Sequence, residues 1–145
     1  MISSLEECLK THSKFFRCRQ AVTVGQVEFA KKLCSLGWRT ITFCETATQL
    51  REGKGQLSEI YLRNYQMIDN QLYEAYLPPP VDIAVLSDSC LRGFSFHVWN
   101  PIITAVVSPS FNTAKFFMGI GHSLIGDFVD DNNNYVEIWQ ASMTE

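Results

Sequence analysis

The sequence lacks several signals that would place a protein in a specialised class. It contains no Cys-x-x-Cys pair, and its five cysteines are an odd number, which favours reduced thiols over a disulfide framework. No apolar stretch approaches the ~18 residues that a membrane-spanning helix needs. The start of the chain, residues 1–7, is acidic and amphipathic rather than typical of a signal peptide. These absences predict a cytoplasmic protein without a membrane span.

An excess of positive charge is also missing. The formal net charge is -3, so the chain as a whole offers no basic field to attract nucleic acid, and we expect no nucleic-acid partner. An anionic ligand would then be bound by a few local donors rather than by the overall charge.

Motifs for metals, phosphates and nucleophilic serines are absent as well. Gly121 and Gly126 are not followed by the Lys-Ser or Lys-Thr of a phosphate loop. Residues 130–134 lack the glycine and the terminal glutamate of a calcium loop. His97 and His122 do not pair with a cysteine at the spacing of a zinc site. The sequence therefore predicts a protein without a metal or an organic cofactor.

The composition itself is that of a globular domain. The 145 residues suffice for one domain with one core, and 46% of them are hydrophobic against 19% charged. We expect a single domain over residues 1–145.

Periodicity and capping residues predict the order of helices and strands. Helices are expected first, with suitable residues at their ends: Ser4 with Glu7 at the first start and Gly37 at the second end. Ser110 is expected to cap the later helix that starts at residue 111. Strands follow, with a hairpin at residues 90–93. The expected helices cover 4–16, 24–36, 45–52, 111–118 and 123–128, and the expected strands cover 57–63, 81–87, 94–99, 102–107 and 135–141. This order predicts an α+β fold whose antiparallel β-sheet is flanked by helices.

Two charged residues stand in apolar strand-like contexts. Glu137 lies between β-branched and aromatic neighbours, and Arg63 follows Ile60-Tyr61-Leu62. Desolvation would raise the pKa of Glu137 and let it act as a general acid, while the planar fork of Arg63 suits a carboxylate. Both side chains could face one pocket that holds a small anion. The alternatives are a solvent-facing Arg63, paired with Glu59, and an outward-facing Glu137.

In its order of motifs the chain resembles the chorismate lyase family over residues 46–138. The shared features are Thr46-Ala47-Thr48-Gln49-Leu50-Arg51 before a glycine-rich turn, the strand with Arg63, the Ala84–Leu86 strand, a helix, the Gly121/Gly126 segment and Val136-Glu137-Ile138. The family usually has a proline where Leu124 stands here.

The resemblance implies a function and a set of site residues. The family removes pyruvate from chorismate and leaves a hydroxybenzoate, without a metal or organic cofactor, inside an antiparallel sheet covered by helical flaps. By the resemblance, Arg63 would grip the ring carboxylate and Glu137 would lie near the leaving oxygen. His97 would be a second carboxylate donor, with Leu86 and Met118 as apolar walls. The expected ligand is a small aromatic or cyclohexadiene carboxylate.

Two other functions fit the same residues. One is a sensor domain of the same fold that binds a small aromatic acid without converting it. The other is a protein–protein adaptor that uses exposed aromatics, with Trp38, Trp99 and Trp139 as the candidates. The oligomeric state is left open by the sequence.

Overall fold

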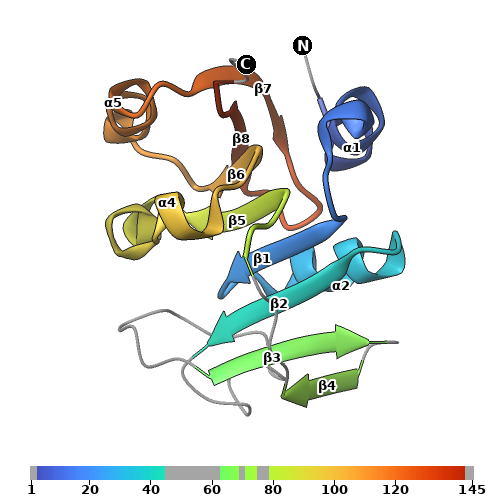
Figure 1. Cartoon of the computed structure of the whole chain (residues 1–145). Helices are drawn as coiled ribbons and strands as arrows, with labels where there is room; N and C mark the ends of the chain where they lie inside the picture. The colour runs from blue at the N-terminus through green and yellow to red at the C-terminus, as the bar shows by residue number, and fades with distance from the viewer. Residues whose placement is uncertain (1–2, 45–62, 69–70, 75–78, 143–145) are drawn as a thin grey trace.

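The described part of the chain forms one β-sheet with helices on both faces (Figure 1). The computed structural model describes residues 3–44, 63–68, 71–74 and 79–142. The sheet has eight strands in the order β4-β3-β2-β1-β5-β6-β8-β7. The strands are β1 (Gln20–Val24), β2 (Arg39–Cys44), β3 (Arg63–Ile68), β4 (Gln71–Glu74), β5 (Ile83–Ser87), β6 (Ile103–Val107), β7 (Ser123–Val129) and β8 (Tyr135–Gln140).

The centre of the sheet is parallel. Strands β2, β1, β5 and β6 run in one direction, whereas β3 with β4 and β8 with β7 add antiparallel pairs at the two sides. The predicted combination of helices with a sheet is confirmed, but the predicted antiparallel order is wrong for these four central strands. Parallel neighbours need a crossover, and the short connections inferred from the sequence had suggested hairpins.

The segment between β5 and β6 shows where the prediction failed. Residues 94–99 were expected to form a strand with alternating sides, but they pass from the 3-10 helix η2 (Asp88–Gly93) into the short helix α4 (Phe96–Trp99). Phe96 and Trp99 pack towards the core at a helical spacing of three residues, while Val98 remains 47% exposed. Residues 96–99 therefore follow the helical period and not the apparent alternation of a strand.

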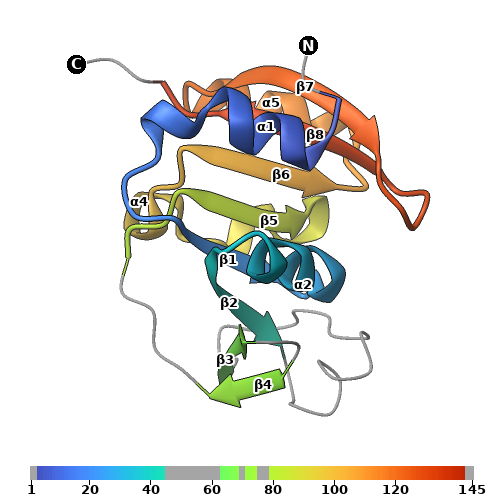
Figure 2. The same ribbon diagram turned by 90° about the vertical axis from the view of Figure 1, so that its right-hand side faces the viewer.

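Two apolar cores, one on each face, hold the layers together. On the first face, α1 (Leu5–Thr11) and α2 (Val27–Ser35) cover the sheet with residues such as Leu5 and Leu33. Figure 2 looks onto this face. On the second face lie η2, α4 and α5 (Phe111–Gly119), with Leu91 and Phe117 as buried members. The molecule thus has three layers, helix–sheet–helix.

Helix starts follow the sequence closely. Ser4 Oγ accepts the amide of Glu7 at 3.0 Å, and Ser110 closes a reciprocal capping box with Thr113, so both predicted caps are confirmed. The first α-helix ends at Thr11 instead of continuing to residue 16 and is followed by η1 (Ser13–Phe15). The helix predicted over 123–128 is wrong, because this segment is the strand β7. The predicted helix 45–52 and most of the predicted strand 57–63 lie outside the described residues.

Strands β1 and β2 were not predicted. All five residues of β1 are buried, so this strand shows no alternation of apolar and polar residues. A central parallel strand is covered on both faces, which removes the period of two that identifies a half-exposed strand. The predicted helix 24–36 begins only at Val27 because Val24 is the last residue of β1.

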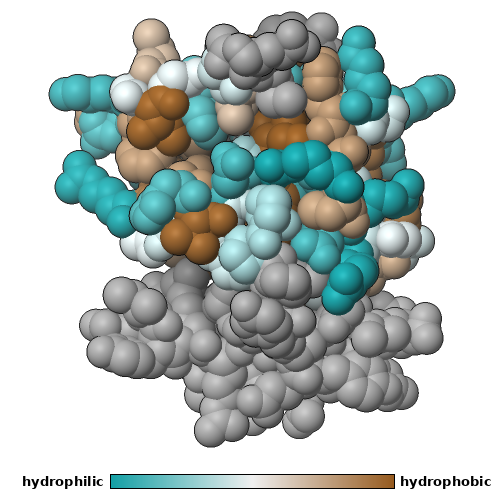
Figure 3. All heavy atoms as spheres, in the orientation of Figure 1, coloured by the Kyte–Doolittle hydropathy of each residue, from teal (hydrophilic) through white to brown (hydrophobic). Residues whose placement is uncertain are grey.

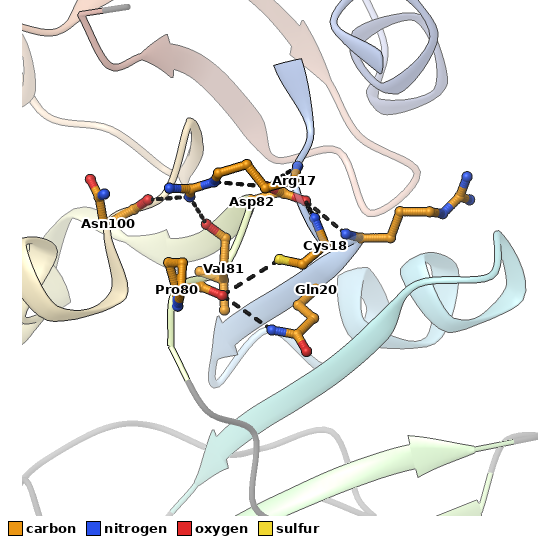
Figure 4. Close-up of polar contacts among 8 residues, drawn as sticks. Arg17, Cys18, Gln20, Pro80, Val81, Asp82 and Asn100 are labelled. Carbon is orange, nitrogen blue, oxygen red and sulfur yellow. Dashed lines mark hydrogen bonds and ion pairs between the residues drawn. The ribbon is translucent and has the colours of Figure 1, made fainter. Parts of the chain in front are cut away.

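A polar anchor joins the loop before β1 to the start of β5 (Figure 4). The carboxylate of Asp82, which is fully buried, accepts the backbone amides of Arg17, Cys18 and Arg19 at 2.9, 2.9 and 2.7 Å. The Arg17 guanidinium also donates to the carbonyls of Val81 and Asn100, each at 2.7 Å. This anchor sits at the amino edge of the parallel strands and leaves their carboxyl edge to other residues.

Candidate functional site

The carboxyl edge of the parallel strands is the candidate site. Helix α2 carries the chain from β1 to β2 over the first face, whereas η2 and α4 carry it from β5 to β6 over the second face. The connections after the neighbouring strands β1 and β5 therefore leave in opposite directions. In open sheets with parallel strands, ligands bind outside the carboxyl ends of the strands at this switch point.

After β1 the chain turns tightly into a helix. Gly25 has a φ of +68°, in the left-handed region that glycine adopts without strain. Gln26 is the residue before α2, and its side chain makes no capping hydrogen bond. The first-turn amides of α2 thus face the carboxyl edge without a side-chain cap, and Glu28 adds a carboxylate there.

After β5 the chain brings two hydroxyls and a thiol together. Ser87 Oγ lies 2.9 Å from Ser89 Oγ and 3.5 Å from Cys90 Sγ. These side chains are small and can each donate or accept a hydrogen bond, as a polar ligand would require.

Asp88 joins this segment to the one after β6. Its carboxylate accepts the hydroxyl of Ser110 at 3.1 Å and makes a second, short hydrogen bond with the hydroxyl of Thr113. Both partners belong to the capping box of α5. The bonds hold the loops after β5 and β6 in a fixed relation, so the edge is preorganised.

Glu137 lies in β8 beside this edge, opposite Val106 of β6. Its pKa is raised, first by burial and then by the negative charges of Asp127 and Asp88, while a 3.3 Å hydrogen bond from Trp139 Nε1 opposes the rise. The raised pKa that the sequence predicts for Glu137 is therefore confirmed. The hydroxyl of Tyr135 donates to Asp127, and this bond raises the pKa of Tyr135 to about 12.

Glu137→Gln is expected to stabilise the protein at neutral pH. The raised pKa means that the folded state disfavours the carboxylate, so wild-type stability relative to the variant falls as pH rises above the ordinary value of 4.5. Glutamine keeps an acceptor for Trp139 but carries no charge to desolvate or repel. Melting temperatures at pH 7 and below pH 4.5 test this, with a gain for the variant at pH 7 that disappears at the lower pH. An equal difference at both pH values would contradict the prediction.

A groove extends from the carboxyl edge over the first face. It measures about 470 Å³ and lies between α1, α2 and the turn after β7. Leu5, Phe29 and Phe128 supply its apolar part, and Lys31 and Lys32 stand at its rim. Each of these lysines is paired with an acid: Lys31 lies 3.6 Å from Glu28, and Lys32 lies 2.5 Å from Glu6. The groove therefore offers little uncompensated positive charge.

The structure does not gather the residues predicted as a site. Four strands lie between β3, which begins with Arg63, and β8, which holds Glu137. Five steps of ~4.8 Å between neighbouring strands place the two strands about 24 Å apart. His97 is exposed on α4, and Met118 is 71% exposed on α5. Leu86 is fully buried inside the core of the second face. A shared pocket of Arg63 and Glu137 is thus not supported by the sheet order.

Of the predicted adaptor aromatics, two are inside the molecule. Trp38 and Trp139 are only 5% and 3% exposed, and Trp99 packs against the core of the second face. Large exposed apolar side chains are found elsewhere, with Phe111 at 92% exposure.

The sequence did not predict the residues of the carboxyl edge as a site, because the direction of the strands decides that they lie at one edge. Gly25 and Glu28 follow a strand that the sequence pattern does not reveal, and Asp88 lies in a segment predicted as a hairpin. A glycine between a buried apolar run and a helix was the available sign.

Comparisons with known proteins give no relatives for this chain. No family model matches it, and no match was found among curated proteins or among solved structures. Within the described residues, no helix is long and apolar enough to cross a membrane, and no group of three or more histidine, cysteine or acidic residues is placed to hold a metal ion.

Proposed function

We propose that this chain binds a nucleoside-containing ligand at the carboxyl edge, between β1 and β5. The observation that carries the proposal is the switch point itself: parallel neighbours β1 and β5 whose connections run over opposite faces. Sheets of this kind bind mononucleotides and dinucleotides at that place. The glycine turn at Gly25 and the first turn of α2 would lie against the ligand.

The charges at this edge favour a ligand with a neutral or cationic head group. Glu28 occupies the first helical turn, where a phosphate would otherwise bind, and Asp88, Asp127 and Glu137 interact electrostatically nearby. Only one glycine, Gly25, stands in the turn, so a G-x-G-x-x-G phosphate motif is absent. S-adenosylmethionine, a nucleoside with a sulfonium charge and no phosphate, has the required chemistry. When bound, it would supply an electrophilic methyl group.

The sequence adds a carboxylate at a spacing that suits a ribose. Glu45 follows Cys44, the last residue of β2, and comes twenty residues after Gly25. In βαβ units that bind dinucleotides, an acid about twenty residues beyond the glycine turn binds the ribose hydroxyls. The spacing supports a ribose as part of the ligand, although Glu45 lies outside the described residues.

Titration calorimetry with Gly25→Ala and a matched control tests the proposal. Gly121 has a φ of +80° and open space around it, so Gly121→Ala imposes the same backbone strain, about 1–2 kcal/mol, at the opposite edge of the sheet. Wild type and Gly121→Ala are expected to bind S-adenosylmethionine, and to bind it more tightly than AMP or NAD. Gly25→Ala is expected to bind it at least about tenfold more weakly.

Two results would overturn the proposal. One is the absence of binding by any nucleoside to the folded wild-type protein. The other is equal affinity of Gly25→Ala and Gly121→Ala for S-adenosylmethionine. Unfolding curves of both variants, recorded beside the titrations, distinguish weaker ligand binding by a folded variant from unfolding.

Chorismate elimination stays a second candidate because one observation favours it. The raised pKa of Glu137 is the property that a general acid at the leaving oxygen would need. Incubation with chorismate, followed by chromatography of pyruvate and hydroxybenzoate, tests this reaction directly. Equal amounts of both products, lost in Glu137→Gln, would establish it. No turnover by folded protein would leave the nucleoside proposal, or a binding-only role for a small aromatic acid.

A further inference from the structure

The net charge of -3 conceals a strong separation of charge along the chain. Residues 3–44 hold seven of the 12 lysines and arginines but only three acidic residues. Residues 79–142 hold six acidic residues and two basic ones. Local fields depend on where charges lie rather than on their sum, so the first segment can attract anions although the whole chain is acidic.

Four exposed cations of this segment gather near the amino edge of the sheet. Lys10 is in the last turn of α1, and Lys14 is in η1. Arg19 directly precedes β1, and Arg39 is the first residue of β2, which pairs with β1. The backbone amide of Arg39 bonds to the carbonyl of Arg19 at 3.0 Å, which holds these two residues side by side. We call these four residues the basic surface.

A groove of about 410 Å³ runs through the basic surface. Its lining includes Lys10 and Arg19 together with Phe16 and Trp38. Phe16 meets Trp38 edge-to-face at 4.9 Å, and the Arg19 guanidinium lies over the Trp38 ring at 5.6 Å. Lys14 likewise lies over the ring of Phe15, at 5.1 Å. Two of the four cations therefore lie over aromatic rings.

The backbone holds Arg19 in an unusual conformation. Its φ is +55°, a left-handed value that is unfavourable for a residue other than glycine. The Asp82 anchor supplies the compensating interaction, because Asp82 accepts the Arg19 amide at 2.7 Å. The guanidinium is further fixed by a 3.2 Å bond to the Leu36 carbonyl. Arg19 is thus positioned before any partner arrives.

Two acids near the basic surface, Glu6 and Asp82, are compensated by their partners. Glu6 also lines the groove, but its carboxylate lies 2.5 Å from Lys32 Nζ. Asp82 is fully buried and accepts three backbone amides as well as Arg17 Nε at 3.4 Å. Figure 3 shows hydrophilic and hydrophobic side chains interspersed over the described part of the face that Figure 1 presents. These two carboxylates therefore offset little of the charge of the four cations.

We infer that the basic surface binds single-stranded nucleic acid. Phosphates complement the four cations, and unstacked bases complement the rings of Phe15 and Phe16, which are half-buried. A groove that combines cations with aromatic rings favours a single strand, because the bases of a duplex are stacked and offer no free face. The surface lies at the edge of the sheet opposite to the proposed nucleoside site, so the two inferences are independent.

Fluorescence anisotropy with a labelled single-stranded RNA and the matching DNA tests this inference. Lys10→Ala/Arg19→Ala removes two members of the basic surface, and Arg92→Ala/Lys115→Ala removes two exposed cations from the second face as a control. At about 50 mM salt, the first variant is expected to bind at least about tenfold more weakly than wild type, and the control within about twofold. The slope of log K against log salt should also become shallower by about 1.4 in the first variant, because each cation that neutralises a phosphate of a single strand adds ~0.7 to it.

Competition separates nucleic acid from other polyanions. Unlabelled single strand should displace the probe, while poly-glutamate of equal charge should displace it poorly, since it has no bases to stack. Equal displacement by poly-glutamate would overturn the inference in favour of an acidic protein partner. No binding at about 50 mM salt, or equal weakening in both double variants, would also overturn it.

Discussion

Asp82→Ala is expected to destabilise the protein by about 3–5 kcal/mol. A buried charge network that loses one partner leaves the others unsatisfied, and losses of this size are typical. Three backbone amides and the Arg17 guanidinium depend on this one carboxylate, which is fully buried. The substitution would also release the strained Arg19 backbone from its amide bond. Urea unfolding followed by circular dichroism measures the loss.

Two further variants make the result specific. Asp131→Ala removes an exposed carboxylate from the turn between β7 and β8 and should change stability by less than about 0.5 kcal/mol. Asp82→Asn keeps one acceptor oxygen and should lie between wild type and Asp82→Ala. If Asp82→Ala unfolded at the same urea concentration as Asp131→Ala, the anchor would not contribute to stability. Nucleic-acid binding by Asp82→Asn, measured below its unfolding transition, would also report whether the anchor positions Arg19.

Phe117→Ala is expected to cost about 3–5 kcal/mol. Phe117 is fully buried on α5, and its ring stacks on Trp139 with centroids 5.0 Å apart and an angle of 10° between the planes. Phe96, Phe116 and His122 also lie around this ring, with centroids at 5.8, 5.3 and 5.5 Å. Truncation to alanine removes the transfer free energy of the ring and leaves a cavity among rigid neighbours. The urea midpoint should fall, with the slope of the transition unchanged.

Phe111→Ala is the matched control for this prediction. Phe111 lies in the same helix with the same side chain but is 92% exposed. Because alanine is the better helix former, the change in stability should be within about 0.5 kcal/mol of zero. Similar destabilisation by both substitutions would show that burial of Phe117 does not hold α5 on the sheet.

The stability of the same core is expected to depend on pH through His122. Burial lowers its pKa, so the folded state favours the neutral imidazole, and its contribution to stability is lost as pH falls below the ordinary value of 6.5. His122 lies against Phe117 and Phe96, which are apolar rings that do not compensate a positive charge. Glu137, in β8, has a raised pKa and also takes up a proton as the pH falls, so comparisons that isolate His122 are best made close to pH 6.5.

Local features were determined by the sequence alone. The caps at Ser4 and Ser110 were predictable because a hydroxyl before an apolar helical repeat binds the first free amides without help from distant residues. The terminal strand and the raised pKa of Glu137 were predictable because both depend on immediate apolar neighbours. The strand β5 was predicted for the same reason, as a short β-branched run after three prolines.

Only the tertiary structure decided strand direction, and with it the place of the candidate site. Residues 94–99 carry an alternation that suits a strand, yet packing of Phe96 and Trp99 on the second face makes them helical and turns a hairpin into a crossover. The parallel order then sets Gly25 and Asp88 at one edge and collects Lys10, Arg19 and Arg39 at the other. Summed charge and local periodicity do not contain this information, because both discard which residues become neighbours when the sheet forms.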